Sequence, residues 1–214
     1  MSLRGWAAVA LLLAAIGWWQ SPMSPRPASA PASADGTAID CRLPPRAAVD
    51  AAPLQSAVPA TAGPFRLEAA TLTPVAGFSL QARVLSRQDY RSGREAQLSP
   101  TDLALGWGRM RDDAVLERLD ISQGARFYRY RWRGSPPLPP AEIVRSSANM
   151  HLIPASAAVA EALQDVRAGE QVRIEGWLVD ARAADGWRWR SSTTRGDSGA
   201  GACELVYVCA LTRL

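Results

Sequence analysis

His151 is the one histidine in the sequence, so any mechanism that needs an imidazole base depends on it. The other basic residues are all arginines, and the sequence contains no lysine. This composition excludes Schiff-base lysines, Ser–Lys dyads and the P-loop lysine. It also excludes a catalytic zinc site built on two or three histidines of one chain. A lone histidine beside apolar residues is usually structural; the functional alternative is a general base that Asn149 orients.

Ser198 is the second weak catalytic candidate. It lies in the stretch GDSGAG, Gly196 to Gly201, which looks like the nucleophile segment of chymotrypsin-like proteases. Only 47 residues separate His151 from Ser198, too few for the two barrels of that fold. We therefore expect a glycine-rich loop here. The carboxylates that could form an acid–base pair, and that we expect by default on the solvated surface, are Asp89, Glu95, Asp102, Glu175 and Glu204.

Three tryptophans, Trp107, Trp187 and Trp189, are the candidate binding residues. Trp187 and Trp189 alternate with arginines, so one face of a strand could present an aromatic strip to a glycan or a partner protein. The alternative is that these rings pack in the core. The stretch 126–132 also alternates arginine with aromatic residues. It is typical of an amphipathic strand with solvated arginines, and we do not expect nucleic acid as a partner.

Three cysteines indicate one disulfide if the chain leaves the cytoplasm. Cys203 and Cys209 lie on one face of a single extended strand, too far apart to bond each other. We predict a disulfide between Cys41 and Cys203, with Cys41–Cys209 as the alternative and one cysteine left over. The spacing lacks the close pairs of zinc motifs, so we expect no metal and no cofactor.

Residues 1–20 are predicted to form an N-terminal membrane anchor or signal segment. Residues 5–19 carry no charge, and Trp18 and Trp19 end the run, where aromatic side chains favour the membrane interface. Arg4 precedes the run and predicts N-in orientation. The length fits a signal peptide as well as an anchor, and we favour an anchor that is retained. The expected location is the inner membrane, single-pass, with the domain in the periplasm.

Residues 21–64 are rich in proline, alanine and serine, and they predict a loose tether. Residues 65–214 then form a single globular domain of ordinary size. Hydrophobic residues make up 48% of the chain and the net charge is +4, which is a normal globular balance.

The hydropathy pattern of the domain predicts α+β structure, with a mostly antiparallel curved sheet or small OB-like barrel, two or three short helices and one preceding transmembrane helix. Period-two alternation places Phe78, Leu80, Ala82 and Val84 on one face of a strand, after a turn at Pro74 and Gly77. Strands are expected over 65–73, 78–90, 126–132, 171–181, 187–192 and 203–211, and helices from 99, over 112–119 and over 156–168.

Three stretches, SRQDYRSGREAQLSPTDLALGWGRM, SSANMHLIPA and WRWRSSTTRGDSGAGACELVYV, resemble a family of N-terminally membrane-anchored proteobacterial proteins. The resemblance covers roughly Phe65 to Val208. No activity is established for that family, so the resemblance implies only the anchor and the domain limits. The pattern from Gly169 to Gly176 is similar to a strand of small OB-like barrels.

We therefore expect a non-catalytic binding or assembly module of the cell envelope, whose partner is an envelope protein or a glycan. The alternative is an envelope hydrolase that uses His151 or a carboxylate near Gly196–Gly201. A cleft that brings His151 within hydrogen-bond reach of Ser191, Ser192 or Ser198 would favour the hydrolase.

Overall fold

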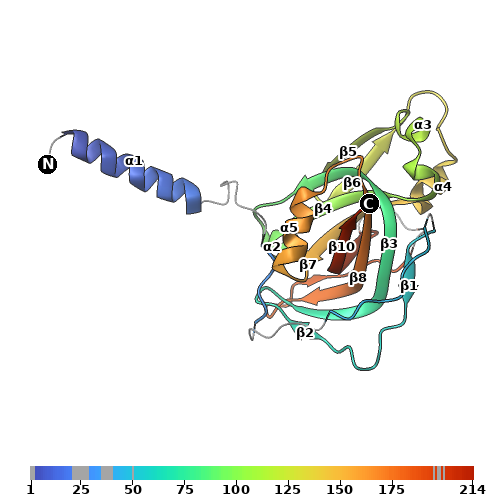
Figure 1. Ribbon diagram of the computed structural model, residues 1–214, viewed down its shortest axis with the longest axis horizontal. Helices are drawn as coiled ribbons and strands as arrows, with labels where there is room; N and C mark the ends of the chain where they lie inside the picture. Colours follow the sequence, from blue (N-terminus) through green and yellow to red (C-terminus); the bar gives the residue numbers. More distant parts are fainter. Residues whose placement is uncertain are drawn as a thin grey trace.

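The computed structural model describes residues 3–20, 29–34, 41–49, 51–194, 196, 199 and 201–214. Figure 1 shows a barrel-like body with an N-terminal helix that projects from it. The helices are α1 Leu3–Gln20, α2 Arg94–Leu98, the 3-10 helix η1 Gly108–Arg111, α3 Asp113–Leu116, α4 Pro140–Arg145 and α5 Ala157–Asp165. The strands are β1 Leu54–Ser56, β2 Phe65–Arg66, β3 Thr71–Asp89, β4 Thr101–Gly106, β5 Asp120–Gly124, β6 Phe127–Arg131, β7 Ser147–Pro154, β8 Gln171–Arg182, β9 Arg188–Trp189 and β10 Glu204–Arg213.

The main sheet has the order β1-β3-β4-β7-β10-β8-β9, and β3 also pairs with β8. The pairings of β3, β4, β7, β10 and β8 therefore run in a ring. Only the β7–β10 pair is parallel; the other pairs of the ring are antiparallel. The prediction of α+β structure with a mostly antiparallel curved sheet is confirmed.

Strand β3 closes the ring because it is long and bent. It has 19 residues, and its pairing shifts register between Pro74 and Ala76 and again between Val84 and Ser86. Such bulges increase the local twist and bend a strand. The turn that we expected at Pro74 and Gly77 is wrong, because the first bulge accommodates Pro74 inside a continuous strand.

The barrel interior holds the main apolar core. The predicted inward face of β3 is confirmed, since Phe78, Leu80, Ala82 and Val84 are all buried in this core. Helix α5 packs on the barrel through Val159 and Leu163. The Ser156 hydroxyl caps this helix by accepting the Val159 N–H at 3.3 Å.

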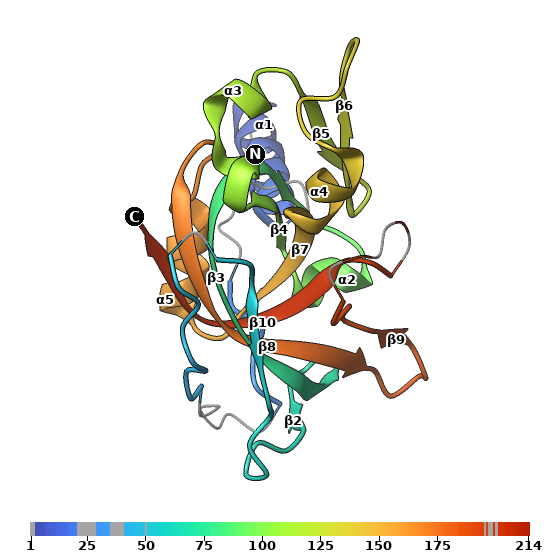
Figure 2. The same cartoon turned by 90° about the vertical axis from the view of Figure 1, so that its right-hand side faces the viewer.

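The chain between β4 and β7 forms an arm that stands away from the barrel. Strands β5 and β6 pair only with each other among the described residues, and Figure 2 shows this hairpin projecting beside α3 and α4. A small apolar cluster at its base joins the arm to the helices. Its buried members are Met110, Val115, Leu119, Leu138 and Ile143.

The segment 41–58 lies against the barrel, which differs from the loose tether that its composition predicts. Cys41 forms a disulfide with Cys209, with Cα atoms 5.4 Å apart. Arg46 Nε donates to Glu175 Oε1 at 2.7 Å, and strand β1 adds to β3. These contacts hold the segment on the barrel although its sequence has no apolar periodicity.

The predicted Cys41–Cys203 disulfide is therefore wrong, and the alternative is found. Strand β10 carries Cys209 past a register shift after Val208, on its way to the C-terminal end. Cys203 precedes β10, close to the β5–β6 arm, where its sulfur lies 3.9 Å from the Arg126 carbonyl oxygen. Cys203 thus lies just before β10, and Cys209 lies near the middle of the strand.

Helix α1 exposes most of its large apolar side chains, Trp6, Leu11, Leu12, Leu13, Ile16 and Trp18 among them. In the described part of the chain, no helix combines the length and the apolar character that crossing a membrane requires.

Candidate functional site

Three polar side chains emerge on the outer face of the barrel from two neighbouring strands. Strands β4 and β7 pair so that Asp102 lies opposite His151. Because side chains alternate along a strand, the residues next to Asp102, Asn149 and His151 point into the core. These inward residues are Leu103, Leu105, Met150 and Leu152.

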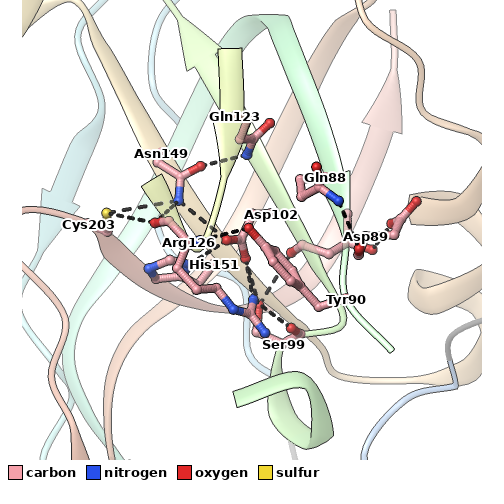
Figure 3. A network of polar contacts seen from close by, with 11 residues as sticks. Gln88, Asp89, Tyr90, Ser99, Asp102, Gln123, Arg126, Asn149, His151 and Cys203 are labelled. Carbon is pink, nitrogen blue, oxygen red and sulfur yellow. Dashed lines mark hydrogen bonds and ion pairs between the residues drawn. The ribbon is translucent and has the colours of Figure 1, made fainter. Parts of the chain in front are cut away.

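The Asp102 carboxylate is the centre of this site. It is fully buried, and Figure 3 shows four side chains converging on it. Arg126 Nη1 lies 2.7 Å from Oδ1, and His151 Nδ1 lies 3.0 Å from Oδ2. Ser99 Oγ and Asn149 Nδ2 donate at 3.4 Å. A buried carboxylate needs such partners to offset the loss of water.

Arg126 reaches the carboxylate from the tip of the β5–β6 arm. The two residues that connect these strands, Ala125 and Arg126, have φ of 51° and 67°. A tight hairpin turn of type I′ needs positive φ at both positions, a conformation that favours glycine or asparagine. The Arg126 backbone is held by two hydrogen bonds. Its N–H donates to Tyr90 Oη at 2.8 Å, and its carbonyl accepts from Asn149 Nδ2 at 3.0 Å.

Two aromatic rings enclose the Arg126 guanidinium. Its Cζ lies 3.7 Å from the centroid of the Tyr90 ring and 5.5 Å from that of Trp189. Both distances are within the range of cation–π attraction. Nη1 also donates to the Ser99 carbonyl at 2.9 Å, and only 18% of the arginine side chain stays exposed.

His151 is closed in by the same groups. Its side chain is 4% exposed, and its ring lies 4.7 Å from the Trp189 ring, centroid to centroid. His151 Nδ1 lies near the carboxylate without hydrogen-bond geometry, so the pair lacks the Nδ1–H hydrogen bond that orients the imidazole of a catalytic triad. The neighbouring serine is engaged elsewhere, because Ser191 Oγ donates to the Ser192 carbonyl and accepts the Leu205 N–H.

A pocket of about 120 Å³ opens beside this network, between the arm, β7 and the start of β10. Asn149 and Cys203 belong to both, since Asn149 Nδ2 lies 3.9 Å from the Cys203 sulfur. Aromatic residues of β6 form one wall. The pocket is lined by Phe127, Tyr128, Tyr130, Val144, Ser147, Ala148, Asn149, Thr194, Gly199, Ala202, Cys203 and Glu204.

Burial changes the acidity of the phenols at this site. Burial raises the pKa of Tyr128 far above its ordinary value. Burial also raises the pKa of Tyr90, although the Arg126 N–H that its oxygen accepts works in the opposite direction. Both phenols therefore stay neutral near pH 7.

The structure brings together part of the predicted site. His151 and Trp189 are in contact, and Trp187 lies next to Trp189, 6.0 Å between ring centroids. Trp107 is not at the site, because it is 3% exposed and packs in the barrel core. Ser198 lies outside the described residues. In the described ranges, no group of three or more His, Cys, Asp or Glu side chains is placed to hold a metal ion.

The predicted carboxylates are dispersed over the molecule. Asp102 is at the centre of the network and Glu204 lines the pocket. Glu175 is buried beneath Arg46 on another part of the barrel. Asp89 pairs with Arg87 and accepts from Thr101 at the end of β4.

Sequence reasoning missed Tyr90, Ser99 and Arg126. The spacing of Asn149 and His151, two residues apart, was a usable signal, because it places both on one face of a strand. No matching signal existed for Arg126, whose direction depends on the left-handed turn. No protein-family model, curated protein or solved structure matches this chain.

Proposed function

We propose that this protein is a non-catalytic binding or assembly module of the cell envelope, anchored by one N-terminal span with its barrel in the periplasm. Helix α1 supports the anchor. Its apolar side chains are exposed, and large exposed apolar surfaces mark contact with lipid or protein.

The ring of five strands supports an OB-like barrel. Its order is β3-β4-β7-β10-β8, with the parallel pair β7–β10 and helix α5 between β7 and β8. OB barrels bind ligands on the face of their second and third strands, flanked by two loops. In this chain that face belongs to β4 and β7, and it carries Asp102, Asn149 and His151.

One observation favours a binding function over a catalytic one. The groups that could do chemistry, Asp102 and His151, are 0% and 4% exposed and lie beneath Arg126 and Trp189. The groups at the open surface are aromatic walls, with Phe127 37% exposed at the pocket. This aromatic surface suits an envelope protein or a glycan. Nucleic acid is disfavoured by the carboxylates of the site.

A photo-crosslinking residue at Phe127 in the full-length chain tests the proposal in cells. We expect one defined adduct with an envelope component at this position. The matched control is Val75, which is equally exposed but lies on β3, and we expect no adduct there. Equal adducts at both positions, or none at Phe127, would contradict the proposed surface. A C-terminal reporter active only in the cytoplasm would contradict the location.

An envelope hydrolase is the second candidate, favoured by the 3.0 Å distance between His151 Nδ1 and Asp102 Oδ2. This function requires Trp189 or the arm to move so that the imidazole meets a substrate. His151→Gln would then abolish hydrolysis of a chromogenic ester or amide by the purified chain. Unchanged cellular function in this variant removes the hydrolase.

A further inference from the structure

The groups around the Arg126 guanidinium form a receptor that is built without the arm. Asp102 comes from β4, Tyr90 and Ser99 from the chain between β3 and β4, and Trp189 from β9. We call these four residues the guanidinium cage. It combines a buried carboxylate, a backbone carbonyl and two aromatic faces. Carboxylates and carbonyls accept the N–H groups of a guanidinium, and aromatic faces attract its charge.

Arg126 enters this cage from outside, as a ligand would. Arg126 lies in the turn at the tip of the arm and belongs to neither of its strands, so its side chain can leave the cage without breaking a strand pairing. The arm itself is held by contacts outside the cage. Gln123 Nε2 donates to Asn149 Oδ1 at 2.7 Å, and Ile121 and Tyr130 pack against the apolar cluster at the base of the arm.

We infer that the guanidinium cage is a binding site for an arginine side chain of a partner protein, which the chain's own Arg126 occupies until the partner displaces it. This inference rests on the proposed binding function and names the chemistry of its partner. A phosphate or sulfate group is disfavoured, because Asp102 would repel it. The aromatic pocket shares Asn149 and Cys203 with the network, so a peptide that delivers an arginine to the cage can also place a neighbouring side chain in the pocket.

Because Arg126 competes with the partner's arginine for the cage, the partner must make more than one contact. A tethered side chain acts at an effective concentration of roughly millimolar. A single free arginine cannot displace Arg126 at lower concentration, whereas a peptide that also fills the pocket can. Removal of Arg126 then removes the competitor and leaves the receptor in place.

The first test uses full-length Arg126→Ala in mild detergent, with ethylguanidinium and ethylammonium as probes. We expect millimolar ethylguanidinium to raise the melting temperature of this variant, since a ligand that binds the folded state stabilises it. Ethylammonium has the same charge without the planar fork and should have less effect. Arg129→Ala is the control, because Arg129 is exposed on β6, the strand that follows Arg126, and lies outside the cage. It should not respond.

Adding Asp102→Asn to Arg126→Ala should abolish the response to ethylguanidinium. Equal responses to the two cations, a response in Arg129→Ala, or a response that survives Asp102→Asn would each overturn the cage as a guanidinium receptor.

The second test measures binding of a short peptide with one arginine, and of its neutral citrulline counterpart. If Arg126 keeps the cage closed for at least about nine-tenths of the time, Arg126→Ala should bind the arginine peptide about tenfold more tightly than the unchanged chain. The citrulline peptide should show no such gain. Equal affinity of the two peptides, or of the two proteins, would overturn the inference. A crosslinked partner at Phe127 would still support the binding module, so the two failures are distinguishable.

Discussion

At the scale of single residues, the molecule is organised around a carboxylate that water does not reach. Asp102 has one cationic neighbour, Arg126, lies 3.0 Å from His151 Nδ1, and accepts hydrogen bonds from Ser99 and Asn149. Removing one member of a buried ion pair leaves the other charge without compensation, which costs more than the pair contributes. Substitutions that change the charge of the site should therefore reduce the stability of the folded protein more than substitutions at its rim.

Asp102→Ala should lower the free energy of unfolding by about 3 kcal/mol, because the largely buried Arg126 loses its counter-ion. Denaturant unfolding followed by tryptophan fluorescence measures the change. Asp113→Ala is the control: Asp113 also pairs with an arginine, but its side chain is 75% exposed. Exposed pairs contribute at most about 1 kcal/mol. Equal losses in the two variants would contradict the central role of Asp102.

All four tyrosines should ionise above their ordinary pKa in the folded protein. Burial raises the pKa of Tyr207 to about 12 and also raises those of Tyr90, Tyr128 and Tyr130. The unfolded chain ionises near the ordinary value of 10.0. The folded state therefore binds more protons above this pH, so its stability is full below pH of about 10 and is lost as the pH rises through about 12.

Ultraviolet absorbance of tyrosinate during an alkaline titration tests this, with the chain in urea as the reference. A titration in which any of the four ionises in the folded protein as it does in urea would contradict the predicted burial.

At the scale of elements, the strands that carry the site were the least predictable ones. The sequence indicates a helix from Ser99, yet Ser99 ends α2 and strand β4 begins at Thr101. Strand β7 has no clear alternation, because both of its faces are buried. A strand covered on both sides loses the period-two signal by which it is recognised.

The elements with one exposed face were recognised from their pattern. Strand β6 alternates exposed and half-buried residues as predicted. Strands β8 and β10 also begin within one residue of the expected positions, although both of their faces are largely buried, because turn residues precede each of them. The pattern does not predict the contacts between elements. It predicts that the arginines of β6 are solvated, and Arg129 and Arg131 are indeed exposed. Arg126 is different because the turn, not the strand, sets its direction.

Gly176→Ala should destabilise the β8–β10 pair. An added Cβ at this position would lie 2.0 Å from the Tyr207 carbonyl oxygen, so the two strands must separate locally. Overpacking of this kind costs about 1–3 kcal/mol. Gly124→Ala on β5 is the matched control, since its Cβ would meet no atom within 4 Å, and its stability should change by less than about 1 kcal/mol. Thermal unfolding compares the two, and similar melting temperatures would contradict the close approach.

At the scale of the whole molecule, strand pairing closes the barrel, and a disulfide bond ties the segment before β1 to it. The disulfide joins Cys41 to Cys209 across 168 residues of sequence. A bond that spans so long a loop restricts the unfolded chain strongly. It also fixes the segment 41–58 on the barrel, where its composition alone would leave it loose.

Replacing both Cys41 and Cys209 by alanine should lower the free energy of unfolding by about 2–5 kcal/mol. The unchanged chain should lose similar stability in reductant, and denaturant unfolding with and without reductant measures both effects. Cys203→Ala is the control, because Cys203 lies outside this disulfide, so the variant should keep its sensitivity to reductant. Reductant-insensitive stability of the unchanged chain would contradict the bond.

The same bond determines how the molecule responds to tension. A pull applied between helix α1 and the C-terminus passes from Cys41 through the sulfur atoms to Cys209 and leaves by the last few residues. The covalent path of this load omits the 167 residues between the two cysteines, which are coupled to the pulled ends by non-covalent contacts, among them the bridge of Ser33 with Leu67 and the pairing of β10 with β8. The covalent path of the load therefore does not pass through the barrel. While the disulfide is intact, such a pull can extend only the two ends of the chain.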